Sequence, residues 1–133
     1  MSKRENYHSA VNRLCQAAEA YLAKREDELY RGGLIQRFEF TTELAWKAVK
    51  EYLTDQGVAV SITTPRAILK EAYAAGMIQH EAVWNDFLSA RNLTSHAYDQ
   101  STAEMIARKI TADFLPELME LDGFFTSQNA RAL

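Results

Sequence analysis

The chain has 133 residues, 47% of them hydrophobic, and a formal net charge of −3 at pH 7. This length suits a single domain, residues 1–133, with a core of its own, and the single cysteine, Cys15, excludes a disulfide within the chain and a thiolate zinc site. The acidic balance argues against a protein that coats nucleic acid with a broad basic surface, so an RNA site would have to be a local basic cleft.

Hydrophobic residues recur at steps of three and four through most of the chain, which predicts helices. The apolar face of the first helix extends to Leu22 and Leu29, and we expect Gly32-Gly33 to end this helix. A second helix is predicted over residues 34–56, with Gly57 as its left-handed cap. The lone cysteine lies within the first apolar pattern, and we expect it to be buried.

The next segments are shorter. Alternating apolar residues over 58–62 predict an extended link. Thr64 is suited to cap a third helix, with Pro65 at its first position and Gly76 closing it. A fourth helix is predicted to begin near Glu81 and to continue through the motif described below.

The last helix is predicted from the capping-box spacing of residues 101–104. Pro116 falls inside it and, because it has no N–H donor for the carbonyl of Ala112, should kink it. We therefore expect an all-α fold, an antiparallel up-and-down helical bundle of four main helices plus a short one. No apolar run approaches the roughly 18 residues that span a bilayer, so we expect a cytoplasmic protein without a membrane partner.

The second predicted helix has two apolar residues on its charged side. Most of its hydrophobic residues share one broad core face, but Phe40 and Leu44 lie one turn apart among Arg37, Glu43 and Lys47. Such a pair can be incidental, or it can form a contact between subunits. We take Phe40 and Leu44 as candidate interface residues.

The fourth predicted helix contains Arg91, then four residues, His96, one residue and Tyr98. By chance this triplet would occur roughly 0.01 times in a chain of this composition. An arginine can clamp phosphate oxygens, and a histidine can transfer protons near pH 7. Taken singly, the three residues have simpler interpretations: a salt-bridge arginine, a helix-terminal histidine and a core aromatic.

The geometry of this motif leaves two possibilities open. The apolar stripe of the fourth helix continues to Arg91, and a guanidinium in that place needs a carboxylate, a cleft or a partner subunit. In an unbroken helix His96 would lie about 140° around the axis from Arg91. Either the helix ends near Ser95, or the arginine and the histidine of two subunits meet across a dimer interface.

The motif resembles that of HEPN (higher eukaryote and prokaryote nucleotide-binding) domains, in which an arginine, often followed by a polar residue such as Asn92, precedes a histidine by four to six residues. More narrowly, Arg91, His96 and Tyr98 are similar to the Arg-x4-His-x-Tyr motif of HepT-type toxins.

Over nearly its full length the chain also resembles the nucleotidyltransferase substrate-binding protein family. The segments that show this are residues 37–47, 64–66 and 84–87. Both resemblances imply a helical bundle that forms a homodimer and is encoded beside a separate minimal nucleotidyltransferase.

The resemblance to HepT implies the toxin of a type VII-like toxin-antitoxin pair. Arg91, with Asn92 and Ser95, would bind RNA or a nucleotide, and His96 would be the general acid or base of a metal-independent RNA endonuclease. Tyr98 would be adenylylated by the nucleotidyltransferase, which acts as the antitoxin. No cofactor is implied.

Two other functions remain open. The family name implies a non-catalytic substrate-binding subunit of a two-component nucleotidyltransferase, and a degenerate bundle could merely bind that enzyme. The chain is not the transferase itself, because it has no Gly-Ser loop followed by an Asp-x-Asp pair. His8, His80 and His96 are scattered over three segments, so we expect no metal site.

Overall fold

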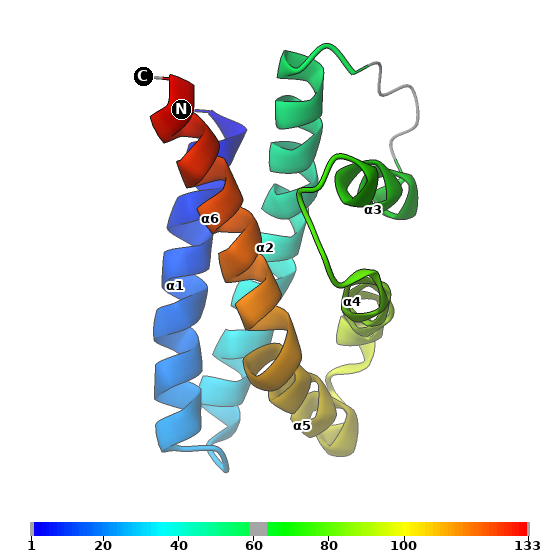
Figure 1. Ribbon diagram of the computed structural model, residues 1–133. Coiled ribbons are helices and arrows are strands. Elements are labelled where there is room, and N and C mark those ends of the chain that lie inside the picture. Colours follow the sequence, from blue (N-terminus) through cyan, green and yellow to red (C-terminus); the bar gives the residue numbers. More distant parts are fainter. Residues whose placement is uncertain (1, 59–63, 133) are drawn as a thin grey trace.

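The computed structural model describes residues 2–58 and 64–132, with side chains up to residue 128 (Figure 1). It contains six α-helices, a 3₁₀ turn and a π-helix, which are α1 (Lys3–Ala23), α2 (Glu28–Asp55), α3 (Pro65–Ala74), α4 (Glu81–Leu93), η1 (Thr94–His96), α5 (Gln100–Lys109), η2 (Ile110–Phe114) and α6 (Leu115–Ala132). These residues contain no strand, so the predicted all-α class is confirmed.

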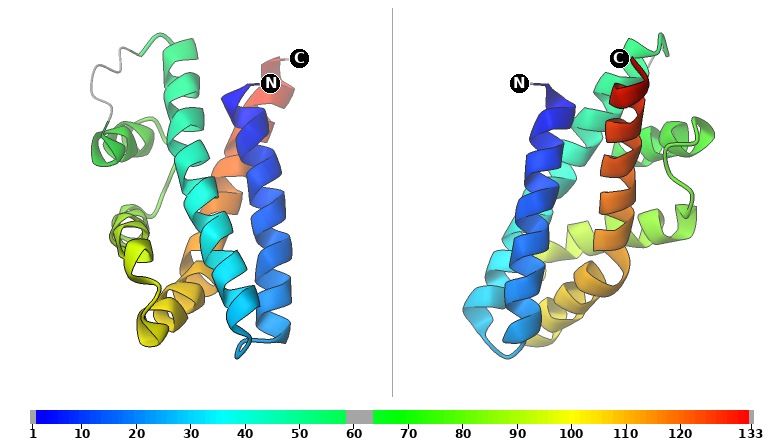
Figure 2. Two further views of the ribbon diagram at one scale, coloured as in Figure 1. Left: turned by 180° about the vertical axis from the view of Figure 1, so that it is seen from behind. Right: turned by 60° about the vertical axis from the view of Figure 1, so that its left-hand side comes forward.

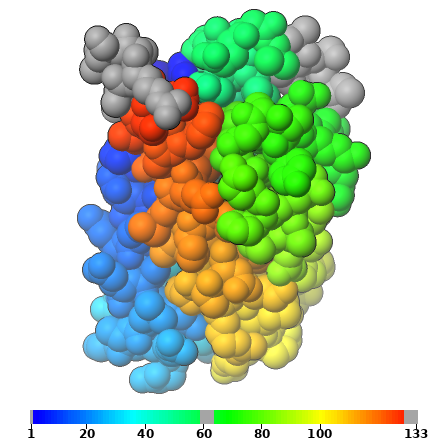
Figure 3. Space-filling model, viewed as in Figure 1, coloured from blue at the N-terminus to red at the C-terminus, as the bar shows by residue number. Residues whose placement is uncertain are grey.

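The helices form a bundle around α1, α2 and α6. The first two run antiparallel along their lengths, and α6 returns beside α1, which brings the two ends of the chain to the same end of the bundle (Figures 1 and 2). Helices α3 and α4 lie across the long axis and are seen nearly end-on in Figure 1. On the face shown in Figure 3, α6 lies between α1 and these two cross-helices.

The predicted boundary between the first two helices was wrong. Helix α1 ends at Ala23, and Gly32-Gly33 lies inside α2. The reason is the N-cap at Asp27, whose side chain accepts the Leu29 N–H at 2.8 Å and begins α2 earlier than predicted. As a result Leu29 belongs to α2 and is 85% exposed, and Leu22 is also exposed, so neither extends the core face of α1.

The glycine and threonine caps were predicted correctly. Thr64 accepts the Ala67 N–H at 3.3 Å, and Pro65 is the first residue of α3. Gly57 and Gly76, with φ of 81° and 75°, follow the ends of α2 and α3 in the left-handed region that favours glycine. The predicted extended link falls mainly on residues 59–63, which lie outside the described residues.

The start and the bend of the last helical segment also differ from the prediction. Asp99, rather than Ser101, is the N-cap of α5. Pro116 was expected to kink the helix, and the distortion found is the π-helix η2, which joins α5 to α6 and ends two residues before the proline. A π-turn is a common cause of a bend, and Figure 1 shows the chain changing direction here.

The core follows the predicted faces. The apolar residues predicted for the core side of α2 are buried, as are those of α4 and the last helical segment. Aromatic rings from α2, α4 and η2 meet at its centre; centroid distances are 5.1 Å for Phe38–Phe87, 5.6 Å for Phe87–Phe114 and 5.7 Å for Trp46–Phe87. Cys15 is only half-buried, contrary to the prediction, although it packs against this core. No helix among the described residues is both long enough and apolar enough to cross a membrane.

The position of the two glycines inside α2 leads to a stability prediction. A Cβ added at Gly32 or Gly33 would meet no atom within 4 Å. Because glycine is the weakest ordinary helix former, Gly32→Ala and Gly33→Ala should each raise the free energy of unfolding by about 0.5–1 kcal/mol. Urea denaturation followed by circular dichroism measures this change.

Gly76→Ala is the matched control, because its φ of 75° is unfavourable for alanine. It should lower the free energy of unfolding. If alanine at 32 and 33 destabilises the protein as it does at 76, the continuous α2 is wrong and the glycine pair does break the helix.

Candidate functional site

The predicted motif lies at the C-terminal end of α4 and in the turn that follows it. The α-helix stops at Leu93, and Thr94–His96 forms a 3₁₀ turn. The Thr94 hydroxyl, which is buried, donates to the Arg91 carbonyl at 2.7 Å and accepts from Arg91 Nη1 at 3.1 Å. Of the two possibilities left by the sequence, the first is confirmed: the helix ends near Ser95.

Arg91 is held against α2. Its Nη2 lies 3.4 Å from a Glu43 carboxylate oxygen, its Nη1 lies 4.0 Å from Glu39, and the side chain is 30% exposed. The buried Arg91 Nε has no hydrogen-bond partner among the described residues. The sequence left three environments open for this guanidinium: a carboxylate, a cleft or a partner subunit. Carboxylates of the chain itself provide the first of these.

His96 and Tyr98 lie together on the surface. His96 Nδ1 is 3.5 Å from the Tyr98 hydroxyl, and the two ring centroids are 6.0 Å apart. Tyr98 is 85% exposed, so its interpretation as a core aromatic is wrong. The apolar stripe does not continue beyond Arg91, because the helix has ended. No hydrogen bond joins the Arg91 and His96 side chains among the described residues.

The two polar residues within the motif are exposed. Ser95 donates its hydroxyl to the Asn92 carbonyl at 3.2 Å, a contact typical of a helix end. Neither side chain is buried by the chain, so both are accessible to a ligand that binds beside Arg91.

Asp99 fixes the chain immediately after the motif. Its carboxylate accepts hydrogen bonds from the Thr102 and Ser101 hydroxyls at 2.8 Å and from the Thr102 N–H at 3.1 Å. The Thr102 hydroxyl, the Ser101 hydroxyl and the Thr102 N–H lower the pKa of Asp99, in that order of size. Thr94 and Asp99 therefore anchor the two ends of the turn that presents His96 and Tyr98.

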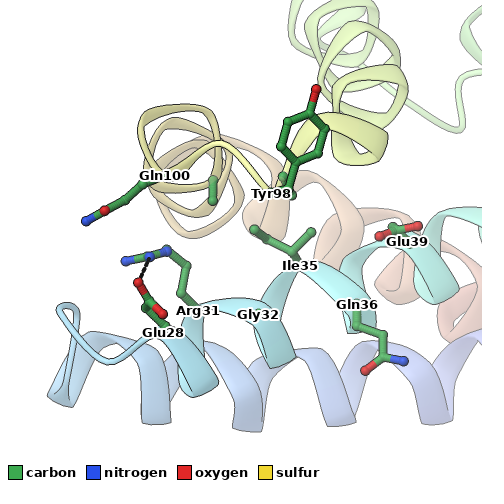
Figure 4. A pocket seen from close by; sticks show the side chains of 10 residues that line it. Glu28, Arg31, Gly32, Ile35, Gln36, Glu39, Tyr98 and Gln100 are labelled. Atoms are coloured by element: carbon green, nitrogen blue, oxygen red, sulfur yellow. Dashed lines mark ion pairs between the residues drawn. The ribbon is translucent and has the colours of Figure 1, made fainter.

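A pocket of about 390 Å³ lies beside Tyr98, between α2 and the start of α5 (Figure 4). Its most buried polar residue is Arg31, which is 5% exposed. The sequence did not indicate Arg31, because the glycine pair was interpreted as a helix end and Arg31 was left outside α2. The pocket is lined by Glu28, Arg31, Gly32, Ile35, Gln36, Glu39, Ala97, Tyr98, Gln100 and Ala103.

The candidate interface residues lie next to this site. Phe40 is 62% exposed and Leu44 is half-buried, as the charged side of α2 predicted. They alternate along the helix with Glu39 and Glu43, the two residues that contact Arg91. A dimer contact through Phe40 and Leu44 stays a prediction.

The histidines lie in separate places, as expected, but one has acidic neighbours that the sequence did not indicate. His80 Nδ1 is 2.6 Å from Glu117, and Glu120 completes a group whose ligand atoms lie within 4.8 Å of one another. The ion pair between His80 and Glu117 accounts for the closeness of two of these residues. His8 instead contacts Asp122 at 2.7 Å.

Comparison with known proteins places the chain in a family. Residues 2–126 match the family described as nucleotidyltransferase substrate binding protein like. The chain belongs to this family. The site is therefore to be compared with those of other nucleotidyltransferase substrate-binding proteins.

Proteins from two bacteria are similar to this chain. The chain is 36% identical over 88 residues to a protein from Haemophilus influenzae named probable ribonuclease HepT, a match that covers 64% of this chain and 60% of that protein. A solved structure from Haemophilus influenzae, described as having the fold of a substrate binding domain of a nucleotidyltransferase, matches with a TM-score of 0.80 and 28% identity over 91% of this chain and 97% of its own. A structure from Thermus thermophilus matches with a TM-score of 0.71 and 27% identity over 92% of this chain and 97% of its own.

The buried Thr94 hydroxyl leads to a test of how the site is held. Thr94→Val keeps the shape of the side chain but removes both hydrogen bonds to Arg91, so it should lower the free energy of unfolding by about 1–2 kcal/mol. Thr111→Val is the matched control, because the Thr111 hydroxyl contacts only carbonyls of its own helix, at 3.1 and 3.2 Å. Urea denaturation should show the larger loss at Thr94, and equal losses would contradict its role in the turn.

Proposed function

We propose that this protein is a HEPN-type toxin of a type VII-like toxin-antitoxin pair, a metal-independent RNA endonuclease that a separately encoded minimal nucleotidyltransferase neutralises by adenylylating Tyr98. The observation that supports this best is the turn after α4, which presents His96 and Tyr98 together on the surface five and seven residues after Arg91. The relative named probable ribonuclease HepT supports the same reaction class.

In the proposed reaction Arg91 binds the scissile phosphate. Its present partners, Glu39 and Glu43, are partly exposed, and ion pairs of that kind contribute little to stability. A phosphate can therefore replace a carboxylate at this guanidinium at small cost, and it offers a similar pair of oxygens. Asn92 and Ser95, both exposed beside Arg91, would donate hydrogen bonds to the sugar-phosphate backbone.

His96 would move the protons. As general base it takes the proton of the ribose 2′-hydroxyl, whose oxygen attacks the adjacent phosphorus. The resulting imidazolium then gives a proton to the 5′-oxygen of the next nucleotide as the bond between that oxygen and phosphorus breaks. The products are a 2′,3′-cyclic phosphate and a 5′-hydroxyl. Stabilisation of the charged transition state by Arg91 would be the larger contribution, and proton transfer adds about 10²–10⁴-fold.

We propose that a second copy of the chain completes this site. No hydrogen bond joins Arg91 and His96 within the described part of one chain, and the exposed Phe40 and half-buried Leu44 alternate with the carboxylates that hold Arg91. Two copies that meet through this side of α2 would bring a second motif to the same cleft. The homodimer would thus let an arginine and a histidine from different chains act on one phosphate.

Tyr98 is the proposed site of regulation. Its phenol oxygen attacks the α-phosphate of ATP on the nucleotidyltransferase, pyrophosphate leaves, and an adenylate remains on the tyrosine. The hydroxyl lies 3.5 Å from His96 Nδ1, so the attached phosphodiester would place a negative charge and bulk beside that ring. RNA would then be excluded from the site.

A cleavage assay in EDTA tests the proposed activity. Wild-type protein incubated with total and transfer RNA should leave 2′,3′-cyclic phosphate ends, whereas His96→Ala and Arg91→Ala should reduce the rate by at least about 100-fold, the loss expected for a general acid-base residue or a charge-stabilising donor. End-group analysis of the fragments by mass spectrometry is the measurement.

Tyr98→Phe is the matched control for that assay. It should cleave RNA as the wild type does, because the phenol takes no part in the reaction. After incubation with the nucleotidyltransferase, ATP and Mg²⁺, the wild type should lose activity and gain the mass of adenylate, whereas Tyr98→Phe should do neither. A folded wild-type protein that leaves RNA intact would overturn the nuclease, and adenylylation of Tyr98→Phe would overturn the modification site.

The interface can be tested separately. Phe40→Glu should convert a dimer into a monomer and reduce cleavage, while the fold persists because Phe40 is already 62% exposed. Met119→Glu is the matched control, an exposed apolar residue on α6, and should remain a dimer. Light scattering gives the mass of each protein, and a wild type that is a monomer at every concentration would exclude the composite site.

A second candidate function is a non-catalytic substrate-binding subunit of a two-component nucleotidyltransferase. It is favoured by the solved relative, described as having the fold of such a substrate binding domain, and by the two carboxylates that occupy Arg91. A protein that binds the nucleotidyltransferase but never cleaves RNA would fit this function. The toxin differs from it by an activity that His96→Ala removes.

A further inference from the structure

We infer that the pocket beside Tyr98 binds the base and ribose of one unstacked nucleotide in the RNA strand cleaved at Arg91 and His96, an inference that rests on the proposed function. The substrate would accordingly be single-stranded RNA or a loop, and the residues that recognise the bound nucleotide would be Arg31, Ile35, Tyr98 and Gln100.

The pocket adjoins the catalytic residues through shared side chains. Tyr98 lines the pocket and contacts His96, and Glu39 lines the pocket and pairs with Arg91. A strand whose scissile phosphate lies at Arg91 would thus place a neighbouring nucleotide at the mouth of the pocket. Shared residues therefore connect the motif to the pocket that contains Arg31.

The size of the pocket suits one nucleotide. Its volume of about 390 Å³ is at the lower end of the range for small-molecule sites, so it has no room for a duplex. The space exists partly because residue 32 is glycine, where an added Cβ would meet nothing within 4 Å. Figure 4 shows Gly32 between Arg31 and Ile35, with Tyr98 on the opposite side.

The lining combines an apolar surface with polar groups. The exposed ring of Tyr98 extends from the rim of the pocket away from Ile35 and offers a face on which a base can stack, and Ile35 adds an apolar surface below. The Gln100 amide can donate to and accept from the edge of a base. Because stacking on an aromatic ring tolerates every base, the pocket would select an unpaired nucleotide rather than a particular sequence.

Arg31 is the least usual residue of the pocket. Its side chain is only 6% exposed, and its contacts with Glu28 and Glu104 are both 3.9 Å long, which exceeds hydrogen-bond distance. Its N–H donors are therefore free to turn towards ribose or base oxygens. The two carboxylates balance the charge of Arg31 without a hydrogen bond, so a ligand need not break one to reach the guanidinium.

The charges decide which part of the nucleotide enters. Glu28 and Glu39 line the pocket, and each faces a guanidinium, Arg31 and Arg91 respectively. Glu104 also pairs with Arg31 and Glu43 with Arg91, so carboxylates outnumber guanidiniums here and the pocket would repel a phosphate. The neutral base and ribose fit it, while the phosphates stay outside at Arg91.

Binding of an uncleavable RNA tests this inference without reliance on activity. The probe is a fluorescent single-stranded hexanucleotide with 2′-O-methyl riboses, in which no 2′-hydroxyl can attack. Gly32→Leu fills the pocket and should weaken binding about tenfold, the loss expected when one stacked base is released. Gly33→Leu is the matched control, since Gly33 is the next residue of α2 and does not line the pocket. Fluorescence anisotropy gives both dissociation constants.

Two further measurements keep the test decisive. In wild-type protein titrated with the hexanucleotide, backbone amide signals of residues 31–36 and 97–103 should shift, which requires no variant to fold. A duplex of the same sequence should bind more weakly. Equal binding by both leucine variants, with no shifts in these segments, would overturn the inference.

Failure of this inference and failure of the proposed function are distinguishable. If wild-type protein cleaves RNA and His96→Ala does not, yet Gly32→Leu binds the hexanucleotide as Gly33→Leu does, the nuclease stands and the pocket is not its nucleotide site. If nothing cleaves RNA but only Gly32→Leu loses binding, the pocket binds a nucleotide for a different function.

Discussion

The ion pairs between Arg91 and helix α2 connect the parts of this protein that matter for its function. Arg91 lies in the last turn of α4, and Glu39 and Glu43 hold its guanidinium on the exposed side of α2. The opposite side of α2 is buried in the core. A single helix therefore both packs the domain and sets the position of the arginine.

This arrangement also shows how an acidic protein can have a local site for an anion. The net charge of −3 gives no general attraction for RNA, but in the proposed function a guanidinium next to a pocket would provide a specific one. The carboxylates around Arg91 and Arg31 have two effects: they stabilise the arginines in the empty protein, and they must be displaced or outcompeted by a ligand. Binding would thus depend on geometry, such as two phosphate oxygens in the right plane, more than on charge alone.

The apolar periodicity was sufficient to predict the helical class and most of the core, because burial of one helix face depends only on the spacing of residues. Local start and stop signals were less reliable. Gly32-Gly33 has a low helix propensity, but the Asp27 cap and the buried residues on both sides of the pair outweigh it. Similarly, Asp99 and Ser101 are both good caps, and only the turn after α4 decides between them. The motif itself could be found in the sequence, whereas Arg31 and Thr94 could not, because their importance depends on what the fold places beside them.

The π-helix between α5 and α6 has a consequence for the rotational alignment of these two helices. Ile106, Ile110, Phe114 and Leu118 are all fully buried, although they are separated by three successive steps of four residues. In a straight α-helix those steps would turn the last side chain about 120° away from the first. The wider π-turn takes up this difference, so both helices present their apolar residues to the same core. Loss of one residue from this turn would rotate all of α6 by about 100°, moving Leu118 and its hydrogen bond from Tyr7 away from α1.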